Sequence, residues 1–302
     1  MNMKTELSIL IPTYNCRCVD LVRALNEQAQ RLRNINYEIV VADDGSTDER
    51  IKTVNACIDV WPNCRYVARE SNLGRSAIRN FLAQTARYSW LLFIDSNVRI
   101  ISNDFLKCYL STDGKGQVIC GGISVGDADE DVRHCLRYLY ERRYMEKRPL
   151  NRRRQYPYQS FRTTNFMVDR DVIRTFPFCE EMRNYGYEDV LWGKYLQQNG
   201  IQVTHIYNPV AYFRYDDNAA FIAKTEEALD TLAAFRNQLR GYSALLTMAE
   251  WMQRYGFASL FLALFRYRKS IWRQRLCGKH PSVFLFNLYR LGYLLIGMGA
   301  EE

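Results

Sequence analysis

Short apolar runs and helix-like repeats alternate along the first hundred residues. Each run is a few residues long and continuous, as expected for a buried strand. The runs are Leu7–Ile11, Glu38–Ala42, Cys64–Ala68 and Trp90–Ile94, and the helices expected between them are Val19–Leu32, Thr47 or Asp48 to about Trp61, and Asn72 or Gly74 to Ala86. This alternation predicts βαβ units and a mainly parallel sheet with both faces covered by helices.

The pattern changes after Ile100. Three further strands and a long helix are expected, with an arginine-rich, tyrosine-containing segment among them. The strands are Val118–Ser124, Phe166–Val168 and Ile201–Ile206, the helix is Asp216–Gln238 with Phe221, Leu229, Leu232 and Phe235 inward, and the arginine-rich segment is Asp131–Arg154. From Gly241 aromatic, aliphatic and basic residues occur together. We therefore expect a catalytic-type α/β domain at residues 1–240 and a helical, basic-aromatic C-terminal extension at 241–302.

Composition narrows the class of protein but does not define it. The chain has 302 residues, a formal net charge of +8 and nine cysteines. The mild basic excess suits phosphorylated substrates or anionic lipid, and scattered cysteines suggest a reducing compartment. Met1–Glu6 is short and polar, and no uncharged run reaches the roughly 18 residues needed to cross a bilayer. These features predict a cytoplasmic protein. No nucleic-acid-binding motif accompanies the charge, so we expect no nucleic-acid partner.

Three acidic loops carry the candidate chemistry. Asp43-Asp44-Gly45-Ser46 and Asp95-Ser96-Asn97 directly follow predicted strands, and Tyr185-Gly186-Tyr187-Glu188-Asp189 precedes a helical stretch. Open α/β sheets bind ligands at the carboxyl ends of their strands, which predicts a shared site. Each loop also has a simpler interpretation as a turn or a helix cap.

A basic segment supplies candidate phosphate ligands. Gly74 lies near a helix start, where free N–H groups favour anions, and Arg75 and Arg79 share one helix face. One of these arginines could reach a diphosphate. The alternative interpretation is a solvated basic face.

The ordered series IPTYN, ADDGSTD, NLGRSAIRN, FIDSNV, TTNFMV and YGYED resembles family 2 glycosyltransferases over about residues 5–215. The resemblance implies the GT-A fold, a Rossmann-like, mainly parallel α/β sheet flanked by helices. It further implies a nucleotide-sugar donor, most often UDP-linked, a Mg²⁺ or Mn²⁺ cofactor and inversion at the anomeric carbon. A glycan or lipid-linked acceptor used in cell-surface polysaccharide synthesis follows from the same resemblance.

The resemblance also assigns roles to single positions. Pro12, Tyr14 and Asp44 would frame the nucleoside, and Arg79 would lie near the base or the phosphates. Asp95 would approach the ribose and the metal, with Asn97 as the second metal ligand, and Thr164 and Asn165 would lie beside the donor sugar or the acceptor. Asp189 matches the family's catalytic base, assisted by Glu188.

Two positions depart from the family pattern. Asn97 stands where relatives usually carry a metal-binding aspartate, and Tyr212 stands where they often carry a metal-contacting histidine. An amide oxygen can still bind a hard cation, whereas a neutral phenol is a poor ligand. The nearest histidine, His205, falls in a predicted strand and is expected to be structural.

The mechanism implied by this assignment is a single displacement. Asp189 would remove a proton from the acceptor hydroxyl. A cation, Arg79 or the segment near Arg142–Arg154 would stabilise the leaving diphosphate. The arginine segment is either a lid over the donor or a solvated helix and loop.

The C-terminal segment and two other functions remain open at this point. Aromatic residues interleaved with cations predict a helix on an anionic membrane surface, peripheral to its inner face, or else a helical appendage packed on the protein. A nucleotidyltransferase uses a similar strand-end acidic site. A non-catalytic scaffold that docks on membranes would account for the two departures.

Overall fold

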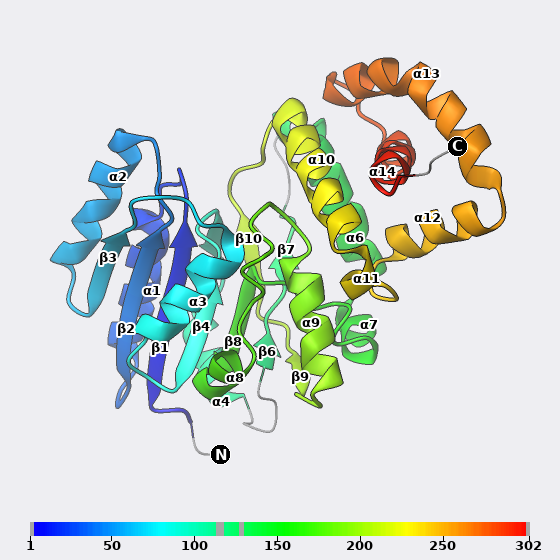
Figure 1. The fold of residues 1–302 in the computed structure, drawn as a ribbon. Coiled ribbons are helices and arrows are strands. Elements are labelled where there is room, and N and C mark those ends of the chain that lie inside the picture. Colours follow the sequence, from blue (N-terminus) through cyan, green and yellow to red (C-terminus); the bar gives the residue numbers. More distant parts are fainter. Residues whose placement is uncertain (1–2, 113–117, 127–129, 300–302) are drawn as a thin grey trace. The chain divides into compact units, whose positions relative to one another are not determined.

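The structure is a computed structural model that describes residues 3–112, 118–126 and 130–299. Contacts divide the chain into two compact units, both drawn in Figure 1. The first unit comprises Met1–Ser124, Arg148–Arg183 and Tyr195–Arg214. The second comprises Val125–Lys147, Asn184–Lys194 and Tyr215–Glu302. The domain boundary expected at residues 240 and 241 stays a prediction.

A seven-stranded sheet forms the centre of the first unit. Its strands are β3 (Cys64–Ala68), β2 (Asn36–Asp43), β1 (Glu6–Thr13), β4 (Trp90–Ile94), β8 (Asn165–Asp169), β6 (Val118–Cys120) and β9 (Val203–His205), in that spatial order. β8 runs antiparallel to both of its neighbours, and the other pairs are parallel. The expected mainly parallel sheet is therefore confirmed.

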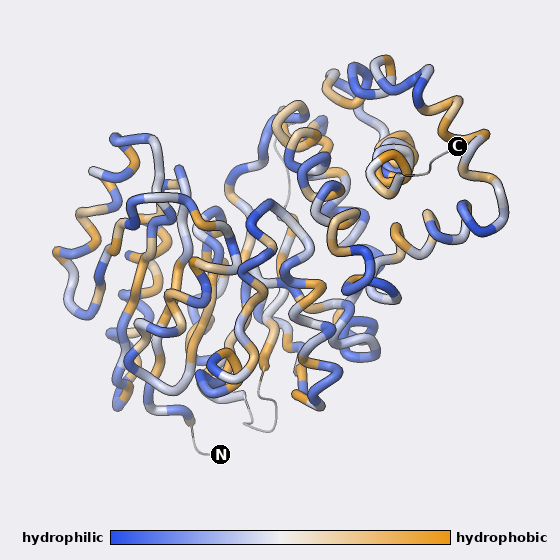
Figure 2. The backbone as a smooth tube through the Cα atoms, in the orientation of Figure 1, coloured by the Kyte–Doolittle hydropathy of each residue, from blue (hydrophilic) through white to orange (hydrophobic). Residues whose placement is uncertain are grey.

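Helices cover this sheet because consecutive residues of β1 and β2 are buried, so both faces of these strands need covering. Figure 2 shows the hydrophobic residues along these strands. The helices are α1 (Val19–Arg31), α2 (Glu49–Ala56) with its 3₁₀ continuation η1 (Cys57–Val60), α3 (Arg75–Thr85), α4 (Phe105–Ser111), α7 (Leu150–Gln155) and α8 (Arg170–Thr175). α3 packs on β1 and α8, and α1 packs on β2 and α4. Asp48 caps α2 by accepting from the backbone N–H groups of Arg50 and Ile51, which confirms the predicted start.

The strand predicted at Val118–Ser124 is wrong in one respect. The segment forms two strands in different sheets, β6 and β7 (Ile123–Ser124). The ladder breaks at Gly121, whose N–H donates to the carbonyl of Asn165 and whose carbonyl accepts from Asn208. After this break β7 joins a three-stranded sheet of order β5 (Val98–Ile100), β10 (Val210–Tyr212), β7.

The second unit is helical. It contains α5 (Glu130–Arg133), α6 (Leu136–Lys147), the first part of α9 (Glu188–Gln198), α10 (Asn218–Ala234), α11 (Arg236–Leu239), α12 (Ala244–Arg254), α13 (Phe257–Cys277) and α14 (Val283–Gly297). Its core joins Leu136, Ile222, Phe265, Leu276, Phe286 and Tyr289. The predicted helix Asp216–Gln238 is interrupted at Phe235, which ends α10 and is only partly buried. Leu229 and Leu232 are buried as predicted.

The arginine-rich segment is helical and falls in both units, as α5, α6 and α7. Two of its arginines contradict the solvated interpretation, because they are buried. Arg137 pairs with Asp216, and Arg153 donates to the carbonyl of Ile206. The role of this segment as a lid stays a prediction. Within the described ranges, no helix is both long enough and apolar enough to cross a membrane.

Candidate active site

The candidate site lies at the carboxyl ends of β1, β2 and β4 in the first unit. Strand order runs outward from β1 to β2 and β3 on one side and to β4 on the other. Ligands bind at such reversal points in open α/β sheets. Thr13 ends β1, Asp43 ends β2 and Asp95 directly follows β4, so the first two predicted acidic loops meet at one edge.

Asp95 is held by two arginines of α3. Its Oδ1 accepts from Arg79 Nη2 at 2.7 Å, and its Oδ2 lies 3.4 Å from Arg75 Nη2. The Arg79 side chain is 1% exposed, whereas that of Arg75 is 36% exposed. Arg79 therefore underlies the carboxylate, and Arg75 is the arginine that faces solvent. The sequence placed both on one helix face but did not show which would be buried.

Thr164 completes the surroundings of Asp95. Its carbonyl accepts from the Asp95 N–H at 3.0 Å, and its hydroxyl donates to the Asp95 carboxylate. Burial acts to raise the pKa of Asp95, but Arg75, Arg79 and this hydroxyl outweigh burial and hold the pKa below its usual value. Asp95 is consequently an anion at neutral pH. The predicted position of Thr164 beside the donor sugar or the acceptor stays a prediction.

Asp44 forms hydrogen bonds with the loop that leads into α3. Its carboxylate accepts from the N–H of Leu73 at 3.2 Å and of Gly74 at 2.9 Å, and lies 3.4 Å from Arg69 Nη1. Burial is the main influence and raises the pKa of Asp44, although these donors act against it. Asp44 and Asp95 thus both contact residues at the start of the same helix. The pairing of Asp44 with Arg69 was missed, because nothing in the sequence relates these two positions.

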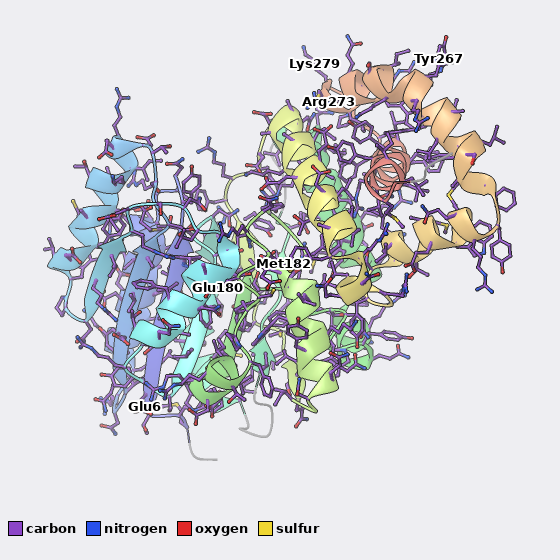
Figure 3. The ribbon with its side chains drawn as sticks, viewed as in Figure 1. Glu6, Glu180, Met182, Tyr267, Arg273 and Lys279 are labelled. Atoms are coloured by element: carbon purple, nitrogen blue, oxygen red, sulfur yellow. The ribbon has the colours of Figure 1, made fainter. Side chains whose placement is uncertain are left out.

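Gly74 allows this loop to pass close to another segment. Its φ is +95°, and a Cβ at this position would lie 2.5 Å from the carbonyl oxygen of Arg183. Asn80 on α3 holds the same neighbouring segment, since its side chain bonds to the backbone of Phe178 and donates to Glu180 at 2.8 Å. Glu180 is labelled in Figure 3. The start of α3 is therefore fixed on both sides.

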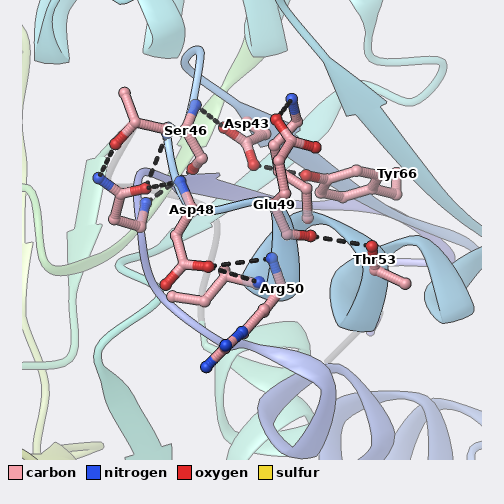
Figure 4. A network of polar contacts seen from close by, with 11 residues as sticks. Asp43, Ser46, Asp48, Glu49, Arg50, Thr53 and Tyr66 are labelled. Atoms are coloured by element: carbon pink, nitrogen blue, oxygen red, sulfur yellow. Dashed lines mark hydrogen bonds and ion pairs between the residues drawn. The ribbon is translucent and has the colours of Figure 1, made fainter.

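The first acidic loop is itself rigidly bonded, as Figure 4 shows. Asp43 accepts from the N–H of Ser46 at 2.7 Å and from the hydroxyl of Tyr66. The loop after β1 is latched to it, because the Asn15 N–H donates to Ser46 Oγ at 2.7 Å. Beside this network Pro12 is partly exposed and Tyr14 is 45% exposed. Tyr14 is therefore accessible to a ligand, and the contacts of Pro12 and Tyr14 with a nucleoside stay a prediction.

The Asn165 side chain has a structural role, because it bonds to three other residues of the first unit. Both hydrogens of its amide nitrogen are used, one by the carbonyl of Gly122 and one by that of Asn208, each at 2.9 Å. Its Oδ1 accepts from the Tyr109 hydroxyl at 2.7 Å. This buried side chain ties β8 to the turn between the two sheets. Its predicted contact with donor or acceptor stays a prediction.

The two departures from the family pattern are neighbours in space. Tyr212 on β10 is paired with Val98 on β5, the residue that follows Asn97. Within the described ranges, no three His, Cys, Asp or Glu side chains group closely enough to hold an ion. Asp95 and Asn97 offer one carboxylate and one amide oxygen. That set suits a hard divalent ion only if diphosphate oxygens and water supply the other positions.

His205 is buried within the sheet and serves structure. Its Nε2 lies 2.9 Å from the Pro157 carbonyl, and its Nδ1 lies 3.4 Å from Arg153 Nη1. A donor at Nε2 and an acceptor at Nδ1 describe the neutral ring. Burial, with the adjacent Arg153, lowers the pKa of His205 to about 4.

Glu188 and Asp189 open α9 in the second unit. Glu188 is buried, and Asp189 Oδ1 accepts from the N–H of Val190 at 2.8 Å. Their assignment as catalytic residues that join the site on the first unit stays a prediction.

Comparisons with known proteins identify the family of this chain. The family described as Glycosyl transferase family 2 matches residues 8–176, which is more than half of the chain. An uncharacterized glycosyltransferase of Haemophilus influenzae is 33% identical over 114 residues, 37% of this chain and 43% of that protein. A poly(ribitol-phosphate) beta-glucosyltransferase of Bacillus spizizenii is 32% identical over 107 residues, 34% of this chain and 17% of that protein. The matched part thus spans less than half the length of these curated relatives.

Solved structures show the fold. The mannosyltransferase PcManGT from Pyrobaculum calidifontis, in complex with GDP-Man and Mn²⁺, has a TM-score of 0.58 at 14% identity, covering 98% of this chain and 86% of that one. S. aureus TarS 1–349 in complex with UDP has a TM-score of 0.51 at 17% identity, covering 95% of this chain and 90% of that one.

The mainly parallel sheet, with polar side chains gathered at the ends of β1, β2 and β4, is a GT-A fold, as the resemblance implied. The chain belongs to glycosyl transferase family 2.

Proposed function

We propose that the protein transfers a sugar from a nucleoside diphosphate donor, a UDP-sugar, to a hydroxyl of a glycan or lipid-linked acceptor in cell-surface polysaccharide synthesis. The observation that carries the proposal is that Asp44 and Asp95, from the ends of two strands, both bond to residues at the start of α3. Arg75 presents a guanidinium there that is 36% exposed, and such a planar cation suits a diphosphate. Family membership supports the reaction class.

The reaction is a single displacement. Asp189 accepts the proton of the acceptor hydroxyl while that oxygen forms a bond to the anomeric carbon, with Glu188 assisting acceptor binding. The bond from the anomeric carbon to the diphosphate oxygen breaks, and its electron pair leaves with the nucleoside diphosphate. Attack opposite the leaving group inverts the anomeric carbon. Arg75 stabilises the charge that develops on the diphosphate, because it is the guanidinium at Asp95 that reaches solvent.

Asp95 and Asn97 would hold a Mg²⁺ or Mn²⁺ ion together with the donor diphosphate. Such an ion supplies positive charge to the leaving group. PcManGT was solved with Mn²⁺, which supports a divalent ion in this fold. Asp95 already pairs with two arginines. We infer that these cations supply part of the positive charge that a metal ion bound by a second carboxylate at position 97 would otherwise provide.

Product analysis tests the proposed reaction. The protein is incubated with UDP-sugars and glycan or lipid-linked acceptors, and free UDP and pyrophosphate are measured. UDP release with a glycosylated product supports sugar transfer, and pyrophosphate release would indicate a nucleotidyltransferase. Asp189→Asn should abolish transfer and leave UDP affinity unchanged, with exposed Asp20→Asn on α1 as the matched control. Donor binding without any turnover in the native protein would favour the non-catalytic scaffold, which the Asn97 and Tyr212 departures motivate.

We further infer that α13 rests on an anionic membrane surface. One face of α13 exposes apolar side chains at helical spacing, namely Phe257, Leu260, Leu264, Tyr267 and Ile271. A different face buries Ala258, Leu262 and Phe265 in the helical core. The packed-appendage interpretation therefore accounts for only one face of this helix. Tyr267 and Lys279 point away from α14 in Figure 3.

Charge favours lipid as the occupant of the exposed face. From Trp251 to Gly299 the sequence has eight Lys and Arg residues and no Asp or Glu. Arg266, Arg268 and Lys279 are exposed along or just beyond α13. A second copy of the chain would place like charges together, whereas anionic headgroups would neutralise them while the apolar face enters the lipid.

Vesicle sedimentation tests this surface. The protein should bind vesicles containing phosphatidylglycerol more strongly than pure phosphatidylcholine, and salt should weaken binding. Leu260→Ser with Tyr267→Ser should reduce binding, while Val60→Ser, which removes an equally exposed apolar side chain of η1, should not. Undiminished binding by the double variant, or a salt-dependent dimer without lipid binding, would contradict it.

A further inference from the structure

The loop Tyr185–Tyr187, directly before Glu188 and Asp189, has an unusual backbone. Gly186 has a φ of +96° and Tyr187 a φ of +66°. Glycine adopts such angles readily, but for a bulky residue like tyrosine they are uncommon and costly. A conformation of this kind persists only where its surroundings hold it, and such strain concentrates at functional sites.

Helix α10 holds the first half of this loop. The N–H of Tyr185 donates to Glu227 Oε1 at 2.8 Å, and the Tyr185 carbonyl accepts from the Thr231 hydroxyl at 3.1 Å. Gly186 lies against the same helix, since a Cβ there would be 2.6 Å from the Cβ of Ala228. The backbone entering α9 is thereby pinned to α10 within the second unit.

Arg290 on α14 holds the second half. The Tyr187 hydroxyl makes side-chain hydrogen bonds with Arg290 and Ser243. Arg290 also donates to the Tyr140 hydroxyl at 3.1 Å, and its guanidinium lies over the rings of Tyr140 and Phe286. It is the only charged residue in the apolar sequence of α14. These contacts explain why a cation interrupts that helix.

We propose that Arg290 is a positioning residue for the transfer reaction: through Tyr187 it fixes the turn that orients the Asp189 carboxylate at the start of α9. The proposal rests on the proposed role of Asp189 as the base. It gives the C-terminal helices a part in catalysis that is separate from membrane docking, because Arg290 contacts the loop and the exposed face of α13 does not include it.

Two conservative variants test the inference. Arg290→Lys keeps the charge but loses the planar fork, and Tyr187→Phe keeps the ring but loses the hydroxyl. Arg240→Lys is the matched control, because Arg240 forms an exposed ion pair with Glu250 in the same unit. Both test variants should speed hydrogen exchange at the amides of residues 187–191. They should also lower kcat by about tenfold or more with little change in the donor KM, because small misplacement of a reacting group is costly.

The outcomes separate the anchor from the base. Exchange and kcat that match the Arg240→Lys control in both variants would overturn the positioning role. A kcat loss that occurs only together with a lower unfolding temperature would overturn it too, because it would show a general structural effect. If Arg290→Lys does not fold, Tyr187→Phe alone decides by the same measurements. Transfer that survives in Asp189→Asn would overturn the proposed base, while exchange at residues 187–191 would still report whether Arg290 holds the loop.

Discussion

Arg79 lies beneath Asp95, with 2.7 Å between Arg79 Nη2 and Asp95 Oδ1. The Arg79 side chain is 1% exposed and that of Asp95 is 13% exposed, so the two charges compensate each other where little water reaches them. Breaking a buried ion pair by removing one partner leaves an uncompensated charge, which costs more than the pair contributes when intact.

Asp95→Asn should therefore destabilise the protein as well as impair donor binding. We expect a loss of about 3–5 kcal/mol in the free energy of unfolding, measured by urea denaturation. Asp20→Asn removes a carboxylate that makes only exposed ion pairs on α1, and should change stability by less than about 1 kcal/mol. Equal stability of the two variants would show that Arg79 does not rely on Asp95.

Gly74 and Gly200 allow a steric effect to be separated from a conformational one. Both have positive φ, but a Cβ at Gly74 would meet the Arg183 carbonyl at 2.5 Å, whereas a Cβ at Gly200 meets nothing within 4 Å. We expect Gly200→Ala to cost about 1 kcal/mol. Gly74→Ala should cost about 3 kcal/mol or more and should weaken UDP binding, because the start of α3 must move. Calorimetric titration with UDP and urea denaturation of both variants measure this, and similar losses in the two would contradict it.

His205 should make stability depend on pH. Its pKa is about 4 in the folded protein and about 6.5 in an unfolded chain. Between these values the unfolded chain binds a proton that the folded protein does not, so stability falls as the pH is lowered from about 6.5 to 4. The full contribution of this group is roughly 3 kcal/mol. His205→Gln should make the urea denaturation midpoint depend less on pH across this window than it does in the native protein, and equal pH dependence of the two would contradict the prediction.

Asn97→Asp should strengthen metal binding. A second carboxylate beside Asp95 raises the ligand charge, and we expect affinity for Mn²⁺ in the presence of UDP to rise by about tenfold or more. Isothermal titration with Mn²⁺ measures it. Asn199→Asp adds the same charge at an exposed position after α9 and should have no effect. Equal affinities in the native protein and both variants would mean that the ion does not bind at position 97.

The contribution of the sequence is clearest in the first hundred residues. β3 and β4 occur at the predicted bounds, and β1, β2, α1 and α3 differ by only a few residues. Continuous apolar runs and helical repeats are local patterns, so they can be read without knowing what packs against them. The same patterns placed Asp44 and Asp95 at strand ends.

Later elements were harder to predict for physical reasons. The sequence predicts a single strand at Val118–Ser124, because the break depends on hydrogen bonds between Gly121 and two residues distant in the sequence, Asn165 and Asn208. The buried arginines Arg137 and Arg153 look solvated in sequence, because their partners lie about fifty to eighty residues away.

By itself the sequence determined the family, the alternation of strands and helices, and the set of candidate residues, since these follow from local order and spacing. Tertiary structure decided which of Arg75 and Arg79 faces solvent, that Tyr212 lies beside Asn97, and that Arg290 supports the turn at Tyr187. Two of these relationships join positions far apart in the chain. The other concerns two arginines on one helix face, of which one is buried and one is exposed. Such relationships depend on packing, and packing is set by the whole fold rather than by neighbouring residues.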